Sequence, residues 1–321
     1  MPLQTKEAAN AGPVSRKSRL RKFLVRTGKV LVAVYFGVLA VLAFYQTHLV
    51  LPGGFNHAAG QDQVLPSNGA VIVPRLDPGD ARILGLFEPA LGADHKAIVD
   101  VASRPTVLYF YGNGSCVRDT VDTVDRFRKD GVNVFVAEYD GYGMNTGAPS
   151  EKACYRTADL AYAYLTHDLH VDPSHLVIAG WSLGSSVAID LASRSKSAGL
   201  VVISPFNNMA ELASRGYPMY PAWLMRLVLR YPFASDQKID RVKCPIMDVH
   251  SRTDEVVPFY MSAKLMSRAK SPVTRVVIER ARHGDFFHVG GHIDRQVVDF
   301  VHRSTTQSPP PVKRTIVLPK P

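Results

Sequence analysis

The sequence predicts a doubly wound α/β fold, with a mostly parallel sheet between helices, preceded by one N-terminal transmembrane helix. Two observations carry this prediction. Short apolar runs alternate with segments of helical period from residue 106 onward, and this alternation is typical of a parallel sheet whose strands are buried on both faces. A charge-free run at residues 30–45 follows a strongly basic N-terminal segment, which is typical of a membrane-spanning helix.

Composition and the location of the charged residues limit the class of protein. With 321 residues and 46% hydrophobic content, the chain can bury one large core, so one globular domain is the simplest expectation. The formal net charge of +10 lies in the termini: residues 1–29 hold eight Lys or Arg against one Glu, and residues 304–321 hold three against none. The remaining residues 30–303 are close to neutral, which argues against a nucleic-acid-binding domain.

The N-terminus is expected to be a basic segment at residues 1–29 and a transmembrane anchor at residues 30–51. At about 1.5 Å per residue this run is long enough to cross a bilayer. The basic flank predicts a cytoplasmic N-terminus, with the rest of the chain on the opposite side.

Two alternatives compete with the anchor. A cleavable signal peptide would use Val41-Leu42-Ala43 as its cleavage site, but the long basic region and the interfacial aromatic residues Phe44 and Tyr45 favour an uncleaved helix. A buried core helix is disfavoured because no polar residue gives the segment a solvent face.

A polar linker at residues 52–69 is expected to lead into the globular domain at residues 70–303. The domain should open with two antiparallel edge strands and continue with six buried strands, at residues 70–73, 82–87, 106–111, 132–137, 176–179, 200–203, 246–249 and 275–278. Helical segments are expected between or after them, at residues 117–127, 153–165, 259–269 and 293–301.

Two further segments stand outside this alternation. Residues 205–235 are rich in aromatic and apolar side chains and form a candidate cap insertion, although helices that simply fill the core would read the same way. The Pro-rich tail at residues 304–321 is expected to be disordered.

The pentapeptide Gly180-Trp181-Ser182-Leu183-Gly184 lies between a predicted strand and a predicted helix. Gly-x-Ser-x-Gly in this context indicates a nucleophile elbow, where the turn is too tight for flanking side chains and exposes the serine hydroxyl. Ser182 is therefore the candidate nucleophile.

A serine hydroxyl needs a base to take its proton and an acid to orient that base, and behind such an elbow they follow in the order acid, then histidine. Asp254 lies in a loop after the predicted strand at 246–249 and is the candidate acid. His283 is the candidate base because it comes first after the last strand and precedes a glycine; His288 and His292 are the alternatives. Asp285 could steady this loop or reach a substrate.

The oxyanion that forms during acyl transfer needs backbone amides fixed in advance. One is expected from Leu183, the residue after the nucleophile, and the second from Asn113, with Gly114 as second choice, in the loop after the first buried strand. No metal or organic cofactor is expected, because the chemistry needs none and the cysteines Cys116, Cys154 and Cys244 are widely spaced.

With these residues placed, the chain resembles the α/β-hydrolase-domain serine hydrolases, whose members include membrane-anchored lysophospholipid lipases and protein depalmitoylases. The resemblance covers residues 70–300 and implies the α/β-hydrolase fold. Besides the elbow its marks are Phe110 to Gly114, Tyr139 to Gly143, Gly147 to Glu151, Ser204-Pro205-Phe206 and Asp254 to Pro258. The chain departs from the family pattern at Tyr111, Asp140, Asn145, Ser251 and Gly284, which weakens any transfer of substrate identity.

These observations predict a membrane-anchored serine hydrolase that cleaves carboxylic esters or thioesters through an acyl-enzyme, with an acyl lipid as a plausible substrate. A peptidase or amidase would use the same residues. The alternative from another class is a non-catalytic binding module that keeps the fold. The sequence names no substrate and no oligomeric state.

Overall fold

The protein is described by a computed structural model that covers residues 16–53, 69–75, 82–286, 293–306 and 314–318. The chain divides into two compact units, Met1–Tyr45 and Gln46–Pro321. The described part of the first unit is the long helix α1, Arg16–Phe44. Within it, the stretch Arg19–Phe44 is long and apolar enough to cross a membrane, a property that signal sequences near an N-terminus share.

In its described residues the second unit contains a nine-stranded sheet with the order β1-β2-β4-β3-β5-β6-β7-β8-β9. The β1–β2 and β2–β4 pairs are antiparallel and the other pairs are parallel. The fold is that of the α/β hydrolases, as the sequence predicted. The strands are β1 Val71–Pro74, β2 Ile83–Glu88, β3 Thr106–Phe110, β4 Asn133–Ala137, β5 Leu176–Trp181, β6 Gly199–Ile203, β7 Ile246–Ser251, β8 Val273–Ile278 and β9 Arg314–Leu318.

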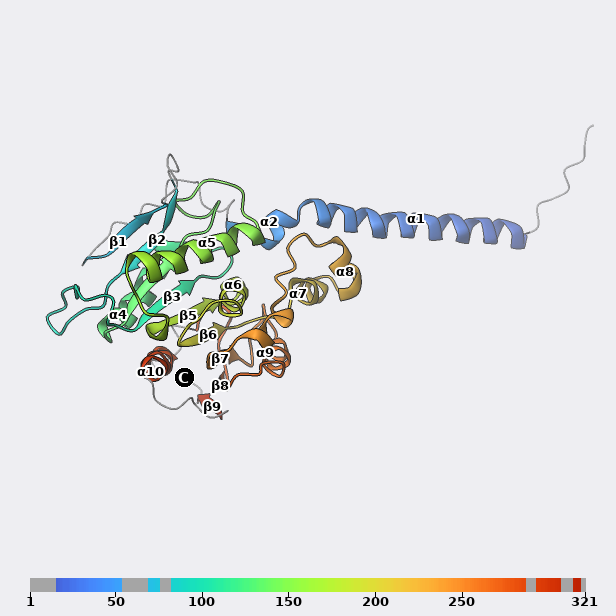
Figure 1. Cartoon of the computed structure of the whole chain (residues 1–321). Helices are drawn as coiled ribbons and strands as arrows, with labels where there is room; N and C mark the ends of the chain where they lie inside the picture. Colours follow the sequence, from blue (N-terminus) through green and yellow to red (C-terminus); the bar gives the residue numbers. More distant parts are fainter. Residues whose placement is uncertain (1–15, 54–68, 76–81, 287–292, 307–313, 319–321) are drawn as a thin grey trace, which may run out of the picture. The chain divides into compact units, whose positions relative to one another are not determined.

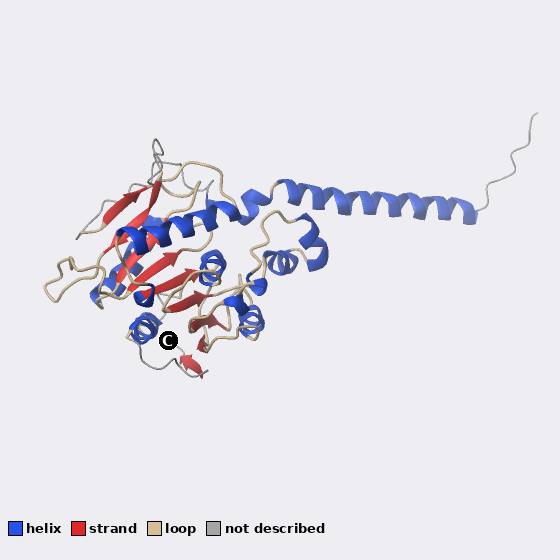
Figure 2. Ribbon diagram, in the orientation of Figure 1, coloured by secondary structure: helices blue, strands red, loops and turns tan. Residues whose placement is uncertain are grey.

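Helices cover both faces of this sheet and form a three-layer arrangement (Figures 1 and 2). The α-helices of this unit are α2 Gln46–Val50, α4 Val121–Lys129, α5 Glu151–Ala163, α6 Leu183–Ala192, α7 Met209–Gly216, α8 Ala222–Val228, α9 Phe259–Met266 and α10 Ile293–Thr305. Shorter helical turns lie at Val117–Thr120, Tyr164–Asp168, Pro173–His175, Ser235–Gln237 and Ile239–Arg241.

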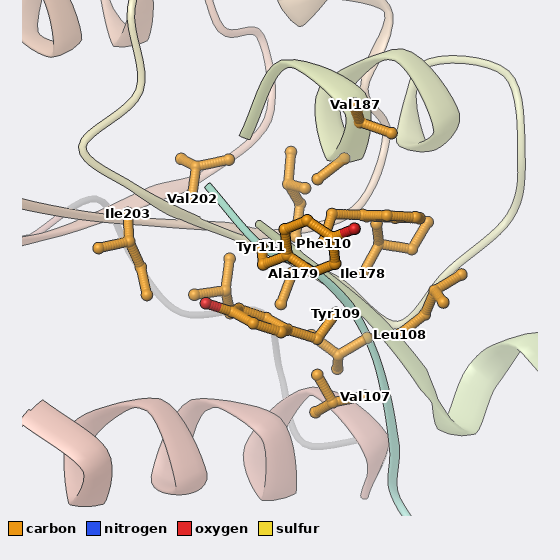
Figure 3. Packing of buried hydrophobic residues seen from close by; sticks show 14 of the residues in the cluster. Val107, Leu108, Tyr109, Phe110, Tyr111, Ile178, Ala179, Val187, Val202 and Ile203 are labelled. Atoms are coloured by element: carbon orange, nitrogen blue, oxygen red, sulfur yellow. The ribbon is translucent and has the colours of Figure 1, made fainter. Parts of the chain in front are cut away.

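The core explains why the central strands read as unbroken apolar runs. Every residue of β3 is buried, since its side chains alternate between two covered faces. Val107 and Tyr109 point to one helical layer, while Val187 of α6 packs over the opposite face (Figure 3). Because the strands around β5 run parallel, their carboxyl ends meet at one edge of the sheet, where residues that follow β3, β5, β6 and β7 are brought together.

The predicted anchor ends earlier than residue 51. Helix α1 stops at Phe44, and Gln46–Val50 forms the short helix α2 inside the second unit. The Gln46 amide donates from Nε2 to the Val228 carbonyl at 3.3 Å and accepts from the Arg230 amide at 2.6 Å. Leu51 is fully buried in the core. The prediction was wrong for residues 46–51, because backbone groups of the globular unit bind the polar side chain that the anchor would have had to accommodate.

The prediction of a disordered C-terminal tail was also wrong in part. Helix α10 runs on to Thr305, and β9 adds a parallel edge strand to β8 with Val276 opposite Ile316. The β-branched run Thr315-Ile316-Val317 suits an edge strand, which outweighs the proline-rich composition around it. Residues 307–313 and 319–321, including the three consecutive prolines, lie outside the described residues.

Candidate active site

Ser182 occupies a strained turn between β5 and α6. Its backbone has φ +52° and ψ −115°, a conformation that L-residues rarely adopt. A Cβ on Gly180 would lie 2.2 Å from the Gly184 carbonyl oxygen, and one on Gly184 would lie 2.0 Å from the Phe110 carbonyl oxygen. Both flanking positions therefore require glycine, and the turn holds the Ser182 side chain at the carboxyl edge of the sheet.

The three side chains predicted to act together meet at this edge. Nε2 of His283 lies 3.0 Å from Oγ of Ser182. Nδ1 of the same ring lies 2.9 Å from Oδ2 and 3.1 Å from Oδ1 of Asp254. The serine and the histidine are 101 residues apart in sequence, so only the parallel order of β5, β7 and β8 brings them into hydrogen-bond contact.

The Asp254 carboxylate is held in its ionised form. Burial raises its pKa, but hydrogen bonds from His250 and His283 and the charge of the histidine outweigh burial, so the pKa lies well below its usual range. The amides of Val256 and Val257 donate to Oδ1 at 3.0 and 2.8 Å. The acid is thus a fixed acceptor for the proton on Nδ1 of His283.

With this geometry established, comparison with known proteins finds relatives that are similar in sequence. An uncharacterized protein of Mycobacterium tuberculosis is 28% identical over 279 residues, 87% of this chain and 94% of that protein. The α/β hydrolase domain-containing protein 17B of Xenopus laevis is 31% identical over 163 residues, 51% of this chain and 54% of the relative. The chain has the fold of the α/β hydrolases and is similar in sequence to proteins named for that fold. No family model matches the sequence.

Solved structures agree with this assignment at the level of the fold. The α/β hydrolase GrgF from Penicillium superposes with a TM-score of 0.58 at 15% identity, over 75% of this chain and 99% of that structure. The Pyrococcus furiosus esterase Pf2001 superposes with a TM-score of 0.53 at 20% identity, over 64% of this chain and 84% of that structure.

Sequence reasoning missed Ser204, a second serine at the site of this α/β hydrolase. Ser204 follows β6, is fully buried, and donates from Oγ to Oδ2 of Asp254 at 2.7 Å. Its φ of +48° is left-handed, a conformation that costs a non-glycine residue about 1–3 kcal/mol. The motif Ser204-Pro205-Phe206 was the available signal, but nothing local in it points to a carboxylate 50 residues away.

His250 is another missed neighbour of the acid. Its ring is buried, and Nε2 lies 2.8 Å from the Val257 carbonyl oxygen and 3.4 Å from Oδ2 of Asp254. A carbonyl oxygen only accepts, so Nε2 carries a proton and turns it toward the carboxylate as well. Phe259 packs edge-on against this ring at a centroid distance of 5.7 Å. His250 therefore adds a further donor to Oδ2 of the acid, the oxygen that also faces His283 and Ser204.

The predicted oxyanion loop follows β3 on the same edge. Leu183, whose amide is the first candidate donor, opens α6 directly after the nucleophile. In the loop, a Cβ on Gly112 would lie 2.9 Å from the Trp181 ring, and Gly114 has φ +77°. The Asn113 side chain accepts a hydrogen bond from the Tyr142 hydroxyl at 3.2 Å, which leaves the backbone amides of Asn113 and Gly114 as candidate donors.

The Trp181 side chain borders His283, the candidate base. Its ring lies 5.5 Å from the His283 ring, which Phe286 meets edge-on at 6.4 Å. Two aromatic rings therefore pack against the imidazole. Asp285, in the same loop, donates its amide to the Arg282 carbonyl at 3.0 Å.

The alternative bases His288 and His292 lie outside the described residues. The three cysteines are buried and unpaired, and burial together with the charge of Asp119 raises the pKa of the Cys116 thiol to about 12. Across the part of the chain that the structure describes, no group of His, Cys, Asp or Glu side chains could hold a metal ion.

Asp140, one of the departures from the family pattern, has a structural partner. Its carboxylate pairs with Arg75 at 2.5 Å and with Arg82 at 3.0 Å. Arg75 follows β1 and Arg82 precedes β2, so this acid ties both ends of the edge hairpin to the loop after β4.

A large hollow in the second unit is remote from the triad. It has a volume of about 770 Å³ and is lined by the turns before β5, β6 and β7, including Asp172, Lys196 and Lys243. These turns precede parallel strands, so the hollow lies at the amino edge of the sheet, whereas Ser182 lies at the carboxyl edge. None of the candidate site residues Ser182, Asp254 and His283 lines this hollow.

Proposed function

We propose that this α/β hydrolase is a serine hydrolase that cleaves carboxylic esters or thioesters through an acyl-enzyme, with Ser182, His283 and Asp254 as its catalytic triad. The observation that carries the proposal is the continuous line of hydrogen bonds from Oγ of Ser182 through the imidazole to the carboxylate. Each contact lies within the 2.6–3.2 Å reach that proton transfer and orientation require.

In the first half of the reaction, Oγ of Ser182 attacks the substrate carbonyl carbon while Nε2 of His283 takes the hydroxyl proton. The tetrahedral intermediate collapses, the bond to the alcohol or thiol breaks, and the imidazolium returns its proton to that leaving group. In the second half, water attacks the acyl-enzyme, gives its proton to the same nitrogen, and the carboxylic acid leaves as Ser182 regains its proton. The net reaction is ester plus water to acid plus alcohol.

The negative charge that develops on the carbonyl oxygen is assigned to the backbone amides of Leu183 and Asn113. Their roles follow from position: Leu183 N begins α6, and the Asn113 loop ends β3, the strand next to β5. A pair of amides at such a site commonly lowers the barrier by several kcal/mol.

The substrate side of the proposal rests on the surroundings of the triad. Solved relatives of the fold include an esterase from Pyrococcus furiosus and a monoacylglycerol lipase from Paleococcus ferrophilus, which favours esters over amides. The apolar cap insertion at residues 205–235 favours an acyl chain. Amide cleavage by the same residues is the second candidate.

We propose that the chain is anchored by its N-terminal helix rather than released by cleavage. The basic residues at positions 16–29 lie on one side of the apolar stretch, which predicts a cytoplasmic N-terminus and a catalytic domain on the opposite side of the membrane. A reporter fused at residue 60 tests this: a reporter active in the cytoplasm would overturn the orientation.

Fluorophosphonate labelling tests the catalytic proposal directly, because the reagent reacts with an activated serine whatever the natural substrate. The full-length protein should label and Ser182→Ala should not, while Ser195→Ala, a matched change outside the site, should label like the wild type. Absence of labelling in all three proteins would favour a non-catalytic binding module. p-Nitrophenyl esters from acetate to palmitate, lysolipids and thioesters, with Ser182→Ala as blank, then define the substrate class.

A further inference from the structure

The cap insertion carries a cluster of exposed apolar side chains. Leu227 is 75% exposed, Trp223 is 65% exposed and Met219 is 61% exposed, with Tyr217 next to them in sequence. Trp223 and Leu227 are four residues apart on α8 and therefore share one face of the helix, while Met225 on the other side is buried. Helix α8 thus has an inner face packed on the domain and an outer apolar face.

The residues that accompany this cluster match the chemistry of a membrane interface. Arg215, Arg226 and Arg230 are exposed in the same insertion, and the Arg226 guanidinium lies 3.6 Å from the Asp236 carboxylate. Its one carboxylate, Glu211, is bound by Lys264 of α9 at 2.9 Å. Tryptophan and aliphatic side chains beside arginines are typical of helices that lie in the plane of a bilayer, where the rings sit among the headgroups and the cations meet lipid phosphates.

The C-terminal end of α8 is also bound to the start of the second unit. Besides the two hydrogen bonds between Gln46 and the backbone at residues 228 and 230, Oγ1 of Thr47 lies 3.0 Å from the Tyr231 hydroxyl. A single residue, Tyr45, separates Gln46 from the end of α1. If α1 spans a membrane, only Tyr45 separates the end of the membrane helix from Gln46. The Gln46 side chain is in turn hydrogen-bonded to the end of α8.

We infer that the outer face of the cap, formed by Met219, Trp223 and Leu227, inserts into the headgroup region of the same bilayer that holds α1. The inference rests on the membrane anchor of the proposed function and identifies its partner as a lipid surface, with Arg215 meeting a phosphate group. A tether of one residue keeps the cap at high effective concentration at that surface, so a small apolar contact is enough for binding.

This contact would connect the membrane to the catalytic site. The cap begins directly after Ser204, which binds the triad acid, and ends at Ser235, whose Oγ lies 2.9 Å from Oγ of Ser186 on α6. The same helix α6 starts at Leu183, next to the nucleophile. A lipid-bound cap would therefore hold the carboxyl edge of the sheet at the bilayer, where an acyl ester can reach Ser182 without crossing water.

Tryptophan fluorescence in nanodiscs tests the contact without any assumption about activity. The chain has two tryptophans, Trp181 beside the triad and Trp223 on the cap. The full-length protein in phospholipid brominated near the headgroup should lose emission relative to unbrominated lipid, and Trp223→Phe should abolish that loss. In the Trp223→Phe background, Leu227→Trp should restore quenching, whereas Val99→Trp, at a position 94% exposed in the same unit, should not.

Each outcome decides the inference. Equal emission in the two lipids, or equal quenching at positions 99 and 227, would overturn it. Emission that depends on protein density in unbrominated lipid would instead assign the face to a second copy of the chain. Flotation with liposomes reports the membrane anchor independently of the cap. A protein that floats but shows no quenching has its anchor and refutes the cap contact. A protein that does not float refutes both the anchor and the cap contact. Fluorophosphonate labelling of the same samples reports the catalytic proposal independently.

Discussion

Replacing Asp254 by asparagine tests the triad through the tautomer of His283. Oδ1 of the acid accepts two backbone amides, so in the variant the single carbonyl oxygen must take that place. The new NH2 group then occupies the Oδ2 position, 2.9 Å from Nδ1 of His283 and 2.7 Å from Oγ of Ser204. A donor at that point forces Nδ1 to accept, which moves the ring proton to Nε2, where it blocks the acceptance of the Ser182 proton.

The expected loss follows from this wrong tautomer. In a Ser-His-Asp triad the same exchange lowers kcat by about 10⁴, which corresponds to about 5 kcal/mol of barrier at about 1.36 kcal/mol per tenfold. Hydrolysis of a p-nitrophenyl ester at pH 7–8 measures it, with Glu255→Gln as the matched control, because Glu255 is exposed and accepts the His283 amide without touching the ring. A folded Asp254→Asn protein that keeps kcat within tenfold of wild type would refute the assigned role of the acid.

Three further predictions follow from the same contacts. Gly184→Ala should lower the free energy of unfolding by on the order of 3 kcal/mol in urea titrations, because its Cβ would lie 2.0 Å from the Phe110 carbonyl oxygen; an unchanged unfolding midpoint would contradict the elbow geometry. Ser204→Ala and Ser204→Gly should both lower kcat by roughly tenfold or more, with KM unchanged, because each removes a hydrogen bond to a charged group. Ser204→Gly should be the more stable of the two variants, since glycine relieves the strain of the positive φ. A loss of kcat that followed the loss of stability would show that the role of Ser204 is purely structural. The pKa of Asp254 is lowered in the folded state, so its ionised form stabilises the protein at pH values above its unfolded pKa of about 3.9, and this stabilisation is lost as the pH falls through the folded pKa. The difference in Tm between wild type and Asp254→Asn should therefore shrink below about pH 4. A constant difference would show that folding does not favour the ionised carboxylate.

Local spacing was sufficient for the strands and for the tight turn at Ser182. The apolar runs at β3 and β5 are buried on both faces, and the glycines beside Ser182 report a turn whose geometry excludes side chains. These signals are local because burial and turn sterics act on consecutive residues. These signals gave the correct structure where the neighbouring residues in the sequence define the environment of a residue.

The same local signals gave the wrong prediction where the structure of a segment depends on residues that are distant in sequence. Gln46 and Thr47 look like tolerated polar residues at the end of an anchor, yet backbone groups near residues 228–231 bind them into the globular unit. At the tail, β9 forms only because β8 offers an unpaired edge. Neither partner can be read from the segment itself.

For this α/β hydrolase the order of residues along the chain was enough to name a serine, an acid and a histidine, since each carries the signature of its own turn or loop. What the order could not supply was Ser204 and His250, which surround Asp254 from β6 and β7. A hydrogen bond depends on distance and direction in space, and Ser204 and Asp254, 50 positions apart, acquire both only when parallel strands set their loops at one edge of the sheet.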